Sequence, residues 1–301
     1  MRLITLHSGH LRVTVAPEAG ASLVSGEANL AGEWIHLLRP TPPEAVTAGN
    51  SSLMASFILA PWSNRLRDAR FGFNGRSYQL RANTPEGYAI HGDVRRRPWQ
   101  IQHLSQESVT LTFDSRSCDD INFPFPFTVR ARYSVEGGSL HSELTLTNTG
   151  RESMPAGLGF HPYFNRGLTP GEDVDLTFRV ARAYAELVPH GPAAPLRPEQ
   201  DFSKRRALGD QEFDDCFAGW DGRAEIQWPK SKVVARFECS PALGHLILFA
   251  PRGQPFFALE PVTQANNGFN LFAAGQSATG VVGLKPDEEL RARFGLEIGR
   301  G

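Results

Sequence analysis

Cysteine is scarce in this sequence, and the few cysteines form no recognisable pattern. Cys118, Cys216 and Cys239 are widely separated, and no two of them make a C-x-x-C pair. An odd number of dispersed cysteines predicts neither a disulfide framework nor a thiolate zinc site. We therefore expect a protein that works in a reducing compartment, the cytoplasm.

Long apolar runs and an excess of one charge are also missing. No stretch of eighteen apolar residues occurs, and the segment 7–10 (HSGH) interrupts the first apolar run. The sequence therefore predicts neither an export signal nor a membrane span. Lys and Arg number 31 and Asp and Glu 32, which gives a net charge of -1 without blocks of like charge. This balance argues against a nucleic acid as partner.

Familiar catalytic signatures are absent as well. The chain has no G-x-x-x-x-G-K-[ST] phosphate loop, no G-x-G-x-x-G after a strand, no G-x-S-x-G elbow and no H-E-x-x-H helix. The nine histidines are scattered, and none is paired with another at metal-ligand spacing. We therefore expect a site that contains no metal.

Strand periodicity is the dominant pattern in what remains. The segment 127–136 (FTVRARYSVE) alternates apolar with polar residues, as a strand with one solvated face does. The same period, or a short run rich in β-branched and aromatic residues, predicts further strands over 109–113, 140–148, 233–239, 245–251 and 289–298. The 29 glycines and 22 prolines supply turns. No long segment has helical periodicity, so the sequence predicts an all-β chain of antiparallel strands.

Two longer segments interrupt this pattern without dividing the chain. Residues 39–52 and 188–210 contain several prolines, and we expect both to be loops on the surface. Neither has the low complexity of an interdomain linker, and no internal repeat is present. We therefore predict a single domain, one large antiparallel β-sandwich over residues 1–301.

A few polar residues lie within apolar or turn-rich segments and are candidates for a site. Glu260 follows four apolar residues and precedes a proline, so we expect it to be buried near a strand end with a partner. Each of the others has a structural explanation too, such as an ion pair for an arginine or a hydrogen-bonded core position for a histidine. The candidates are Asn64, Arg65, His91, His161, Asp214, Asp215 and Glu260.

Taken in order, these residues resemble the motifs of the aldose 1-epimerase (galactose mutarotase) family. The resemblance runs from about residue 60 to residue 270, and its most specific part is the His-x-Tyr-Phe-Asn motif at residues 161–165. The other matches are Asn64-Arg65, Gly75, Tyr78-x-Leu80, His91-Gly92, Trp99, Asp214 with Phe217, and Glu260-Pro261.

This resemblance implies a galactose mutarotase-like supersandwich with an open groove and a cofactor-independent isomerase. Such an enzyme interconverts the α and β anomers of free aldoses, with a hexose such as glucose or galactose as substrate. The resemblance assigns the base to Glu260 and the acid to His161. It implies that Arg65, His91 and Asp214 bind the sugar, supported by Asn64. It leaves open whether the protein is a monomer or a homodimer.

Several alternatives remain at this stage. Arg95, Arg96 and Arg97 fit a solvated edge strand, but an arginine cluster also suits a phosphate or an acidic sugar, as in a hexose-6-phosphate 1-epimerase. A non-catalytic carbohydrate-binding module, or an isomerase or lyase of modified sugars, would keep the same fold. Asn266-Asn267 stands where many relatives have an acidic residue. The charge of His161 is also open, because Glu260 would raise its pKa and burial would lower it.

Overall fold

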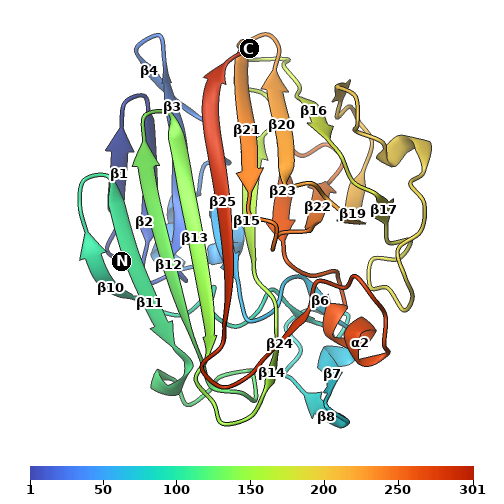
Figure 1. The fold of residues 1–301 in the computed structure, drawn as a ribbon. Coiled ribbons are helices and arrows are strands. Elements are labelled where there is room, and N and C mark those ends of the chain that lie inside the picture. The colour runs from blue at the N-terminus through green and yellow to red at the C-terminus, as the bar shows by residue number, and fades with distance from the viewer.

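Two large antiparallel sheets lie face to face in the computed structural model, which describes residues 1–301 (Figure 1). The first sheet has ten strands, with β4 paired only to β3. In spatial order they are β1 (Ile4–Ser8), β2 (Leu11–Ala16), β3 (Ser22–Leu30) with β4 (Glu33–His36), β5 (Ser56–Leu59), β15 (Gly159–Asn165), β23 (Phe256–Val262), β22 (His245–Ala250), β19 (Phe213–Ala218) and β17 (Arg182–Ala183).

The second sheet has nine strands and lies in front of the first in Figure 1. Its order is β10 (Gln100–Leu104), β11 (Ser108–Asp114), β12 (Phe127–Glu136), β13 (Ser139–Asn148), β25 (Glu289–Arg300), β21 (Val233–Cys239), β20 (Arg223–Trp228), β16 (Asp175–Phe178) and β18 (Arg206–Ala207).

Smaller elements gather at one end of the two sheets, at the bottom of Figure 1. They include the pairs β6 (Arg65–Leu66) with β9 (Ala89–Ile90), β7 (Arg70–Phe73) with β8 (Arg76–Gln79), and β14 (Met154–Ala156) with β24 (Val282–Leu284). The helices are short: α1 (Pro43–Ala48), α2 (Gly268–Ala273), and the 3-10 turns η1 (Ser51–Leu53), η2 (Arg67–Ala69), η3 (Ser115–Ser117) and η4 (Pro198–Gln200). No helix is both long enough and apolar enough to cross a bilayer.

The predicted strands are confirmed, and their alternation explains the core. β12 occupies 127–136, and its burial alternates residue by residue, so one face of the strand packs inward while the other meets solvent. A cluster of 68 buried hydrophobic residues, drawn from both sheets, fills the space between them. Tyr133 of β12 is buried there, and its hydroxyl donates a hydrogen bond to the Ala21 carbonyl beside β3 at 2.9 Å. The all-β prediction is therefore correct.

Residues 39–52, predicted as loop, contain α1 and the start of η1 instead. Pro43 takes the first helical position, where its missing N–H costs nothing, and Gly49 ends the helix with a left-handed backbone. Residues 188–210 match the prediction better, because they hold only η4 and the two-residue strand β18.

The central strands of the ten-stranded sheet are buried on both faces. β15 and β23 have almost no exposed residue, unlike the alternating strands of the other sheet. A second hydrophobic cluster of 11 residues, which includes Phe57, Tyr163 and Ile247, covers the face directed away from the main core. The candidate residues His161 and Glu260 lie on this outer face.

Candidate active site

Strand register brings His161 and Glu260 together. In the β15–β23 ladder Gly159 pairs with Val262 and Tyr163 with Ala258, so the same register sets residue 161 opposite residue 260. Side chains of a strand alternate between its two faces, and Phe160 and Phe164 point into the main core. His161 therefore points to the outer face. Nε2 of His161 lies 3.2 Å from Oε1 of Glu260.

This pair is almost entirely buried, and burial controls its charge. Only 5% of the His161 side chain and 2% of the Glu260 side chain are exposed. Burial lowers the pKa of His161 well below its ordinary value, and the positive charges of Arg39 and Arg95 act in the same direction. Burial also raises the pKa of Glu260 well above its ordinary value, assisted by the negative charge of Asp214. Burial thus opposes the charged form of each group, because neither ion is well solvated.

Asn64, Arg65 and His91 are brought to the pair by a short ladder. β6 pairs with β9 so that Arg65 faces Ile90, and the backbone N–H of His91 donates to the Asn64 carbonyl at 3.0 Å. Asn64 and His91 both have left-handed backbones, with φ of 51° and 67°. The imidazole of His91 meets that of His161 edge to face, with ring centroids 5.1 Å apart.

Arg65 links this ladder to the far side of the site. Its Nη2 lies 3.2 Å from Oδ2 of Asp214 on β19, and its Nη1 donates to Oδ1 of Asn64 at 3.1 Å. The side chains of Arg65 and Asp214 are 19% and 30% exposed, far more than those of His161 and Glu260. This ion pair is therefore the side of the cluster that lies nearer to solvent. All six residues to which the family resemblance gives a role belong to one cluster.

Several buried polar atoms in this cluster have no hydrogen-bond partner. They are Nδ1 of His161, Nδ1 of His91 and Oε2 of Glu260. Each unpaired buried polar group costs about 1–3 kcal/mol, so a ligand that forms hydrogen bonds with these atoms would remove that cost. A molecule rich in hydroxyl groups would satisfy both donors and acceptors here.

Four residues surround the pair, and sequence reasoning missed two of them, Phe57 and Arg39; Tyr163 belongs to the His-x-Tyr-Phe-Asn motif, and Arg95 belongs to the arginine cluster. The rings of Phe57 and Tyr163 lie 4.4 and 4.5 Å from that of His161, and the guanidinium of Arg39 stacks 3.6 Å above the Tyr163 ring. Strand alternation also puts Tyr163 on the face of His161, because it lies two residues later. Arg39 could not be found in this way, since it comes from an irregular segment.

The arginine cluster at 95–97 does not form the solvated edge strand that its sequence favoured. The segment consists of turns, and only Arg96 is exposed. Arg95 is buried, with its guanidinium 5.2 Å from the Phe57 ring, whereas Arg97 pairs with Asp93 at 3.1 Å. The difference arises because the left-handed turn at His91-Gly92 folds this segment back against β5.

Asn266 and Asn267 form hydrogen bonds to the backbone of a neighbouring loop. Nδ2 of Asn266 donates to the Leu187 carbonyl at 2.9 Å, and Nδ2 of Asn267 donates to the Pro189 carbonyl at 2.8 Å. The backbone N–H of Asn267 also donates to the Arg65 carbonyl at 2.7 Å. These amides therefore attach the 187–190 segment beside the site.

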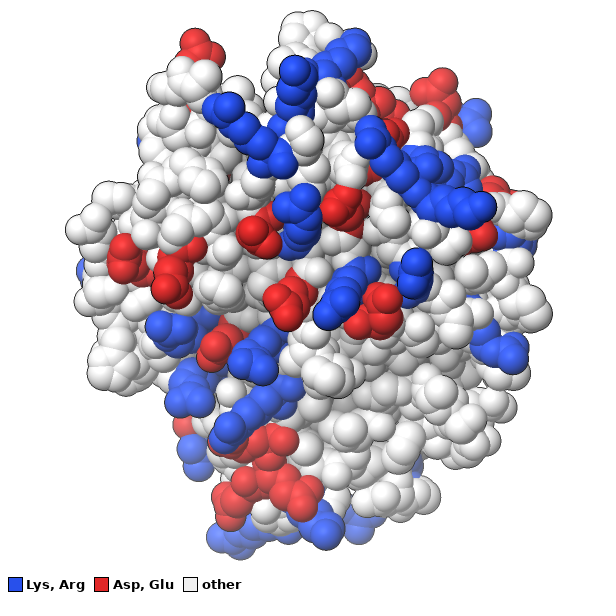
Figure 2. Space-filling model, turned by 45° about the horizontal axis from the view of Figure 1, so that its top comes forward, with Lys and Arg blue, Asp and Glu red and all other residues white.

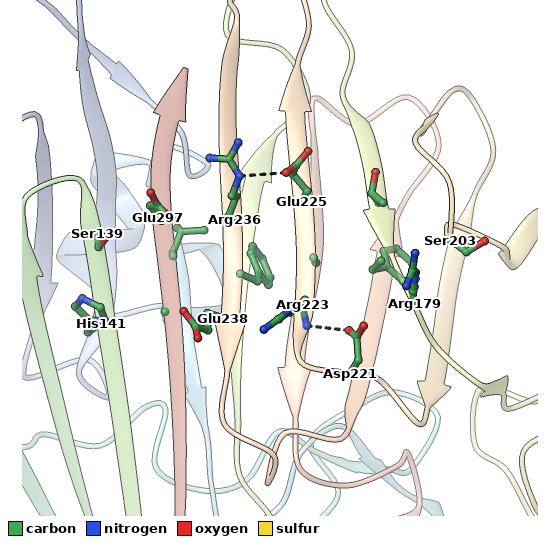
Figure 3. Close-up of a pocket in the computed structure, with 16 residues that line it drawn as sticks. Ser139, His141, Arg179, Ser203, Asp221, Arg223, Glu225, Arg236, Glu238 and Glu297 are labelled. Atoms are coloured by element: carbon green, nitrogen blue, oxygen red, sulfur yellow. Dashed lines mark hydrogen bonds and ion pairs between the residues drawn. The ribbon is translucent and has the colours of Figure 1, made fainter. Parts of the chain in front are cut away.

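A separate hollow of about 540 Å³ lies on the outer face of the nine-stranded sheet. Figure 2 shows acidic and basic side chains interspersed on this side of the molecule. In the close-up of Figure 3, Arg236 pairs with Glu225 at 3.2 Å, and Asp221 accepts from the Arg223 backbone N–H. None of the predicted site residues lines this hollow, so it does not contribute to the acid–base cluster.

Comparison with known proteins agrees with the motifs. The sequence model of the family described as aldose 1-epimerase matches residues 2–297. Escherichia coli K12 has two similar proteins, both described as uncharacterized: YphB, 27% identical over 99% of both chains, and YihR, 30% identical over 90% of this chain and 89% of its own.

Solved structures agree on the fold. A galactose mutarotase-like protein from Clostridium acetobutylicum superposes with a TM-score of 0.85 at 18% identity, covering 99% of this chain and 95% of its own. The two packed sheets, with no more than short helices, are therefore the galactose mutarotase-like fold. The chain belongs to the aldose 1-epimerase family.

Proposed function

We propose that this protein is an aldose 1-epimerase, an isomerase that interconverts the α and β anomers of free aldoses in the cytoplasm without a cofactor. The observation that carries the proposal is the direct contact of an imidazole and a carboxyl group, 3.2 Å apart, on one sheet face. Anomerisation needs a base for the C1 hydroxyl and an acid for the ring oxygen, and both oxygens are bonded to the same carbon. Two side chains in contact can reach both oxygens at once.

Ring opening then proceeds by one proton transfer at each oxygen. Glu260 as carboxylate takes the proton of the C1 hydroxyl, and the electrons of that oxygen form the C1 carbonyl. The bond between C1 and the ring oxygen breaks, and its electron pair stays on the ring oxygen, which takes a proton from His161. Rotation about C1–C2 exposes the other carbonyl face. Ring closure reverses both transfers, so Glu260 and His161 recover their original states.

The buried environment fits this cycle although it favours the uncharged pair. A protonated Glu260 beside a neutral His161 contains as many protons as a carboxylate beside an imidazolium. The reactive form therefore arises when one proton moves across the 3.2 Å contact, with no exchange with solvent. Hydrogen bonds from sugar hydroxyls to the unpaired Oε2 of Glu260 would stabilise the carboxylate.

The remaining residues suit the binding of sugar hydroxyls. Arg65 and His91 can donate hydrogen bonds, Asp214 can accept two, and Asn64 fixes Arg65 through its side-chain oxygen. Because Arg65 and Asp214 are more exposed than the buried pair, we expect the sugar to enter beside them. A carbohydrate-binding module without catalysis would need these groups but would have no use for the buried pair.

Polarimetry of fresh α-glucose and α-galactose tests the proposal. We expect the wild-type protein to accelerate mutarotation, and Glu260→Gln and His161→Asn each to lower kcat about 10²- to 10⁴-fold. Glu238→Gln is the matched control, because this residue lines the hollow on the other sheet, and it should keep the wild-type rate. Wild-type rates in the Glu260→Gln protein would refute the assignment. Sugar binding without turnover by the wild-type protein would support the non-catalytic alternative.

A further inference from the structure

Two arginines next to the catalytic pair are held side by side by one residue, Ser52. Nη2 of Arg39 donates to the Ser52 carbonyl at 3.0 Å and to the Met54 carbonyl at 2.8 Å. Nη1 of Arg95 donates to the Ser52 hydroxyl. The two guanidinium groups thus reach the same short turn from different parts of the chain.

Neither guanidinium has a carboxylate partner. No acidic side chain forms an ion pair with either group, and none contributes to the pKa of Arg39 or of Arg95. Several other partly buried arginines differ: Arg65 pairs with Asp214, Arg97 with Asp93, and Arg166 with Asp173. Buried charges in proteins are normally paired, because desolvation of an unpaired ion is costly.

Aromatic rings cover these two arginines. Arg39 stacks on Tyr163 at 3.6 Å and lies 4.7 Å from the Phe256 ring, and Arg95 lies 5.2 Å from the Phe57 ring. Such rings stabilise a guanidinium without neutralising it. Burial and the charge of Arg96 together lower the pKa of Arg95 to about 10, which still leaves it cationic near neutral pH. The site therefore has an uncompensated positive charge of two.

The position of Arg39 and Arg95 relative to His161 and Glu260 indicates which end of a bound sugar would contact the two arginines. Phe57 lies opposite His161 on β5, and Tyr163 follows His161 on β15, so both arginines lie on the His161 side of Glu260. Arg65 and Asp214 lie on the other side, toward β19. In a pyranose the ring oxygen is bonded to carbon 5, which bears carbon 6. A sugar that offers its ring oxygen to His161 therefore directs carbon 6 toward Arg39 and Arg95.

We infer that this site takes aldoses with an anionic group at carbon 6, and that Arg39 and Arg95 bind this group. The inference rests on the proposed ring opening by Glu260 and His161. Arginine matches both phosphate and carboxylate with paired N–H donors, so the shared chemistry is a terminal oxyanion. An anionic group bound here would neutralise the positive charge of the two arginines, whereas a neutral sugar would not.

Exchange NMR of four sugars tests this inference, because it measures anomerisation directly for each of them. Glucose is the neutral reference, and glucose 6-phosphate, glucose 6-sulfate and glucuronate carry a dianion, a tetrahedral monoanion and a planar monoanion. We expect kcat/KM for at least one anionic sugar to exceed that for glucose about 10-fold or more. The best of the three identifies the oxyanion.

Three variants test whether the preference for an anionic sugar depends on Arg39 and Arg95 or on any positive charge near the site. Arg39→Gln and Arg95→Gln should each lower the ratio of kcat/KM for the anionic sugar to that for glucose by about 10- to 100-fold, the effect of one charge-assisted hydrogen-bonded group. Arg96→Gln removes the same charge from an exposed neighbour and should keep the wild-type ratio.

The outcomes also distinguish this inference from the proposed function. Turnover of glucose with kcat/KM equal to or above that of all three anionic sugars would overturn the inference and leave the epimerase proposal intact. If no sugar is turned over, the epimerase proposal fails. Calorimetry of sugar binding to the Glu260→Gln protein then tests the anion site separately. Tighter binding of an anionic sugar than of glucose would then support the anion site, and equal or weaker binding would overturn it.

Discussion

Gly92 is the residue at which a single methyl group should disturb both stability and activity. Its φ is +69°, and a Cβ added there would lie 1.9 Å from the Ala60 carbonyl oxygen, where real Cβ atoms keep at least 3.0 Å. In Gly92→Ala the two backbones must therefore separate by about 1 Å. This movement would break the 2.9 Å hydrogen bond from the Asp93 N–H to the Ala60 carbonyl.

The expected decrease in stability follows from these two effects. A left-handed alanine costs roughly 1–2 kcal/mol, and breaking a buried hydrogen bond so that its acceptor is left unpaired costs about 1–3 kcal/mol. We expect Gly92→Ala to lower the free energy of unfolding by about 2–5 kcal/mol, measured by urea denaturation. Gly75→Ala is the matched control, because Gly75 has φ of +74° but no atom within 4 Å of an added Cβ. Its free energy of unfolding should fall by about 1–2 kcal/mol.

Activity should fall as well, because the same turn positions His91 beside His161. A displacement of about 1 Å at a positioning residue costs about 10²-fold in rate, so kcat/KM of Gly92→Ala should fall by this amount and that of Gly75→Ala should not change. If the Gly92 and Gly75 variants are destabilised equally, the close approach to Ala60 does not exist as described.

Two further predictions concern Asp214 and Tyr133. Asp214→Asn removes a negative charge that favours protonation of Glu260, so uptake of a further proton by the His161–Glu260 pair should become less favourable. The acidic limb of kcat/KM against pH should therefore move to lower pH, and a limb that moves upward would contradict this electrostatic argument. KM should rise about 10-fold, because an amide accepts hydrogen bonds from sugar hydroxyls less strongly than a carboxylate does. Tyr133→Phe should lower the free energy of unfolding by about 1–3 kcal/mol, because the buried Ala21 carbonyl no longer receives the hydrogen bond of the Tyr133 hydroxyl. Urea denaturation measures this change. An unchanged midpoint of the urea transition would show that this hydrogen bond between the sheets does not stabilise the protein.

Local patterns in the sequence were sufficient to predict the positions of the main strands. Alternation over 127–136 reproduces β12 residue for residue, and the segments 233–239 and 289–298 become β21 and most of β25. These predictions succeed because side-chain alternation depends only on the backbone of the strand itself. The error at 39–52 arose where a helix of six residues is too short for helical periodicity to appear.

The order of the motifs also led to a set of residues that lie together in the fold, without giving their arrangement. The motifs point to Asn64, Arg65, His91, His161, Asp214 and Glu260, and the fold collects all six in one cluster. The sequence could not predict that Arg95 is buried while Arg96 remains exposed, since this depends on which backbone the segment packs against.

The sequence by itself determined the strand content, the balance of charge and the identity of the titratable residues, because each depends on composition or on neighbours along the chain. Only the tertiary structure decided that His161 faces Glu260, since the register of β15 with β23 is fixed by packing across the whole sheet. It also decided that this pair is buried, and it placed two unpaired guanidinium groups beside it. Burial and countercharge are properties of assembled surroundings, and no single segment contains them.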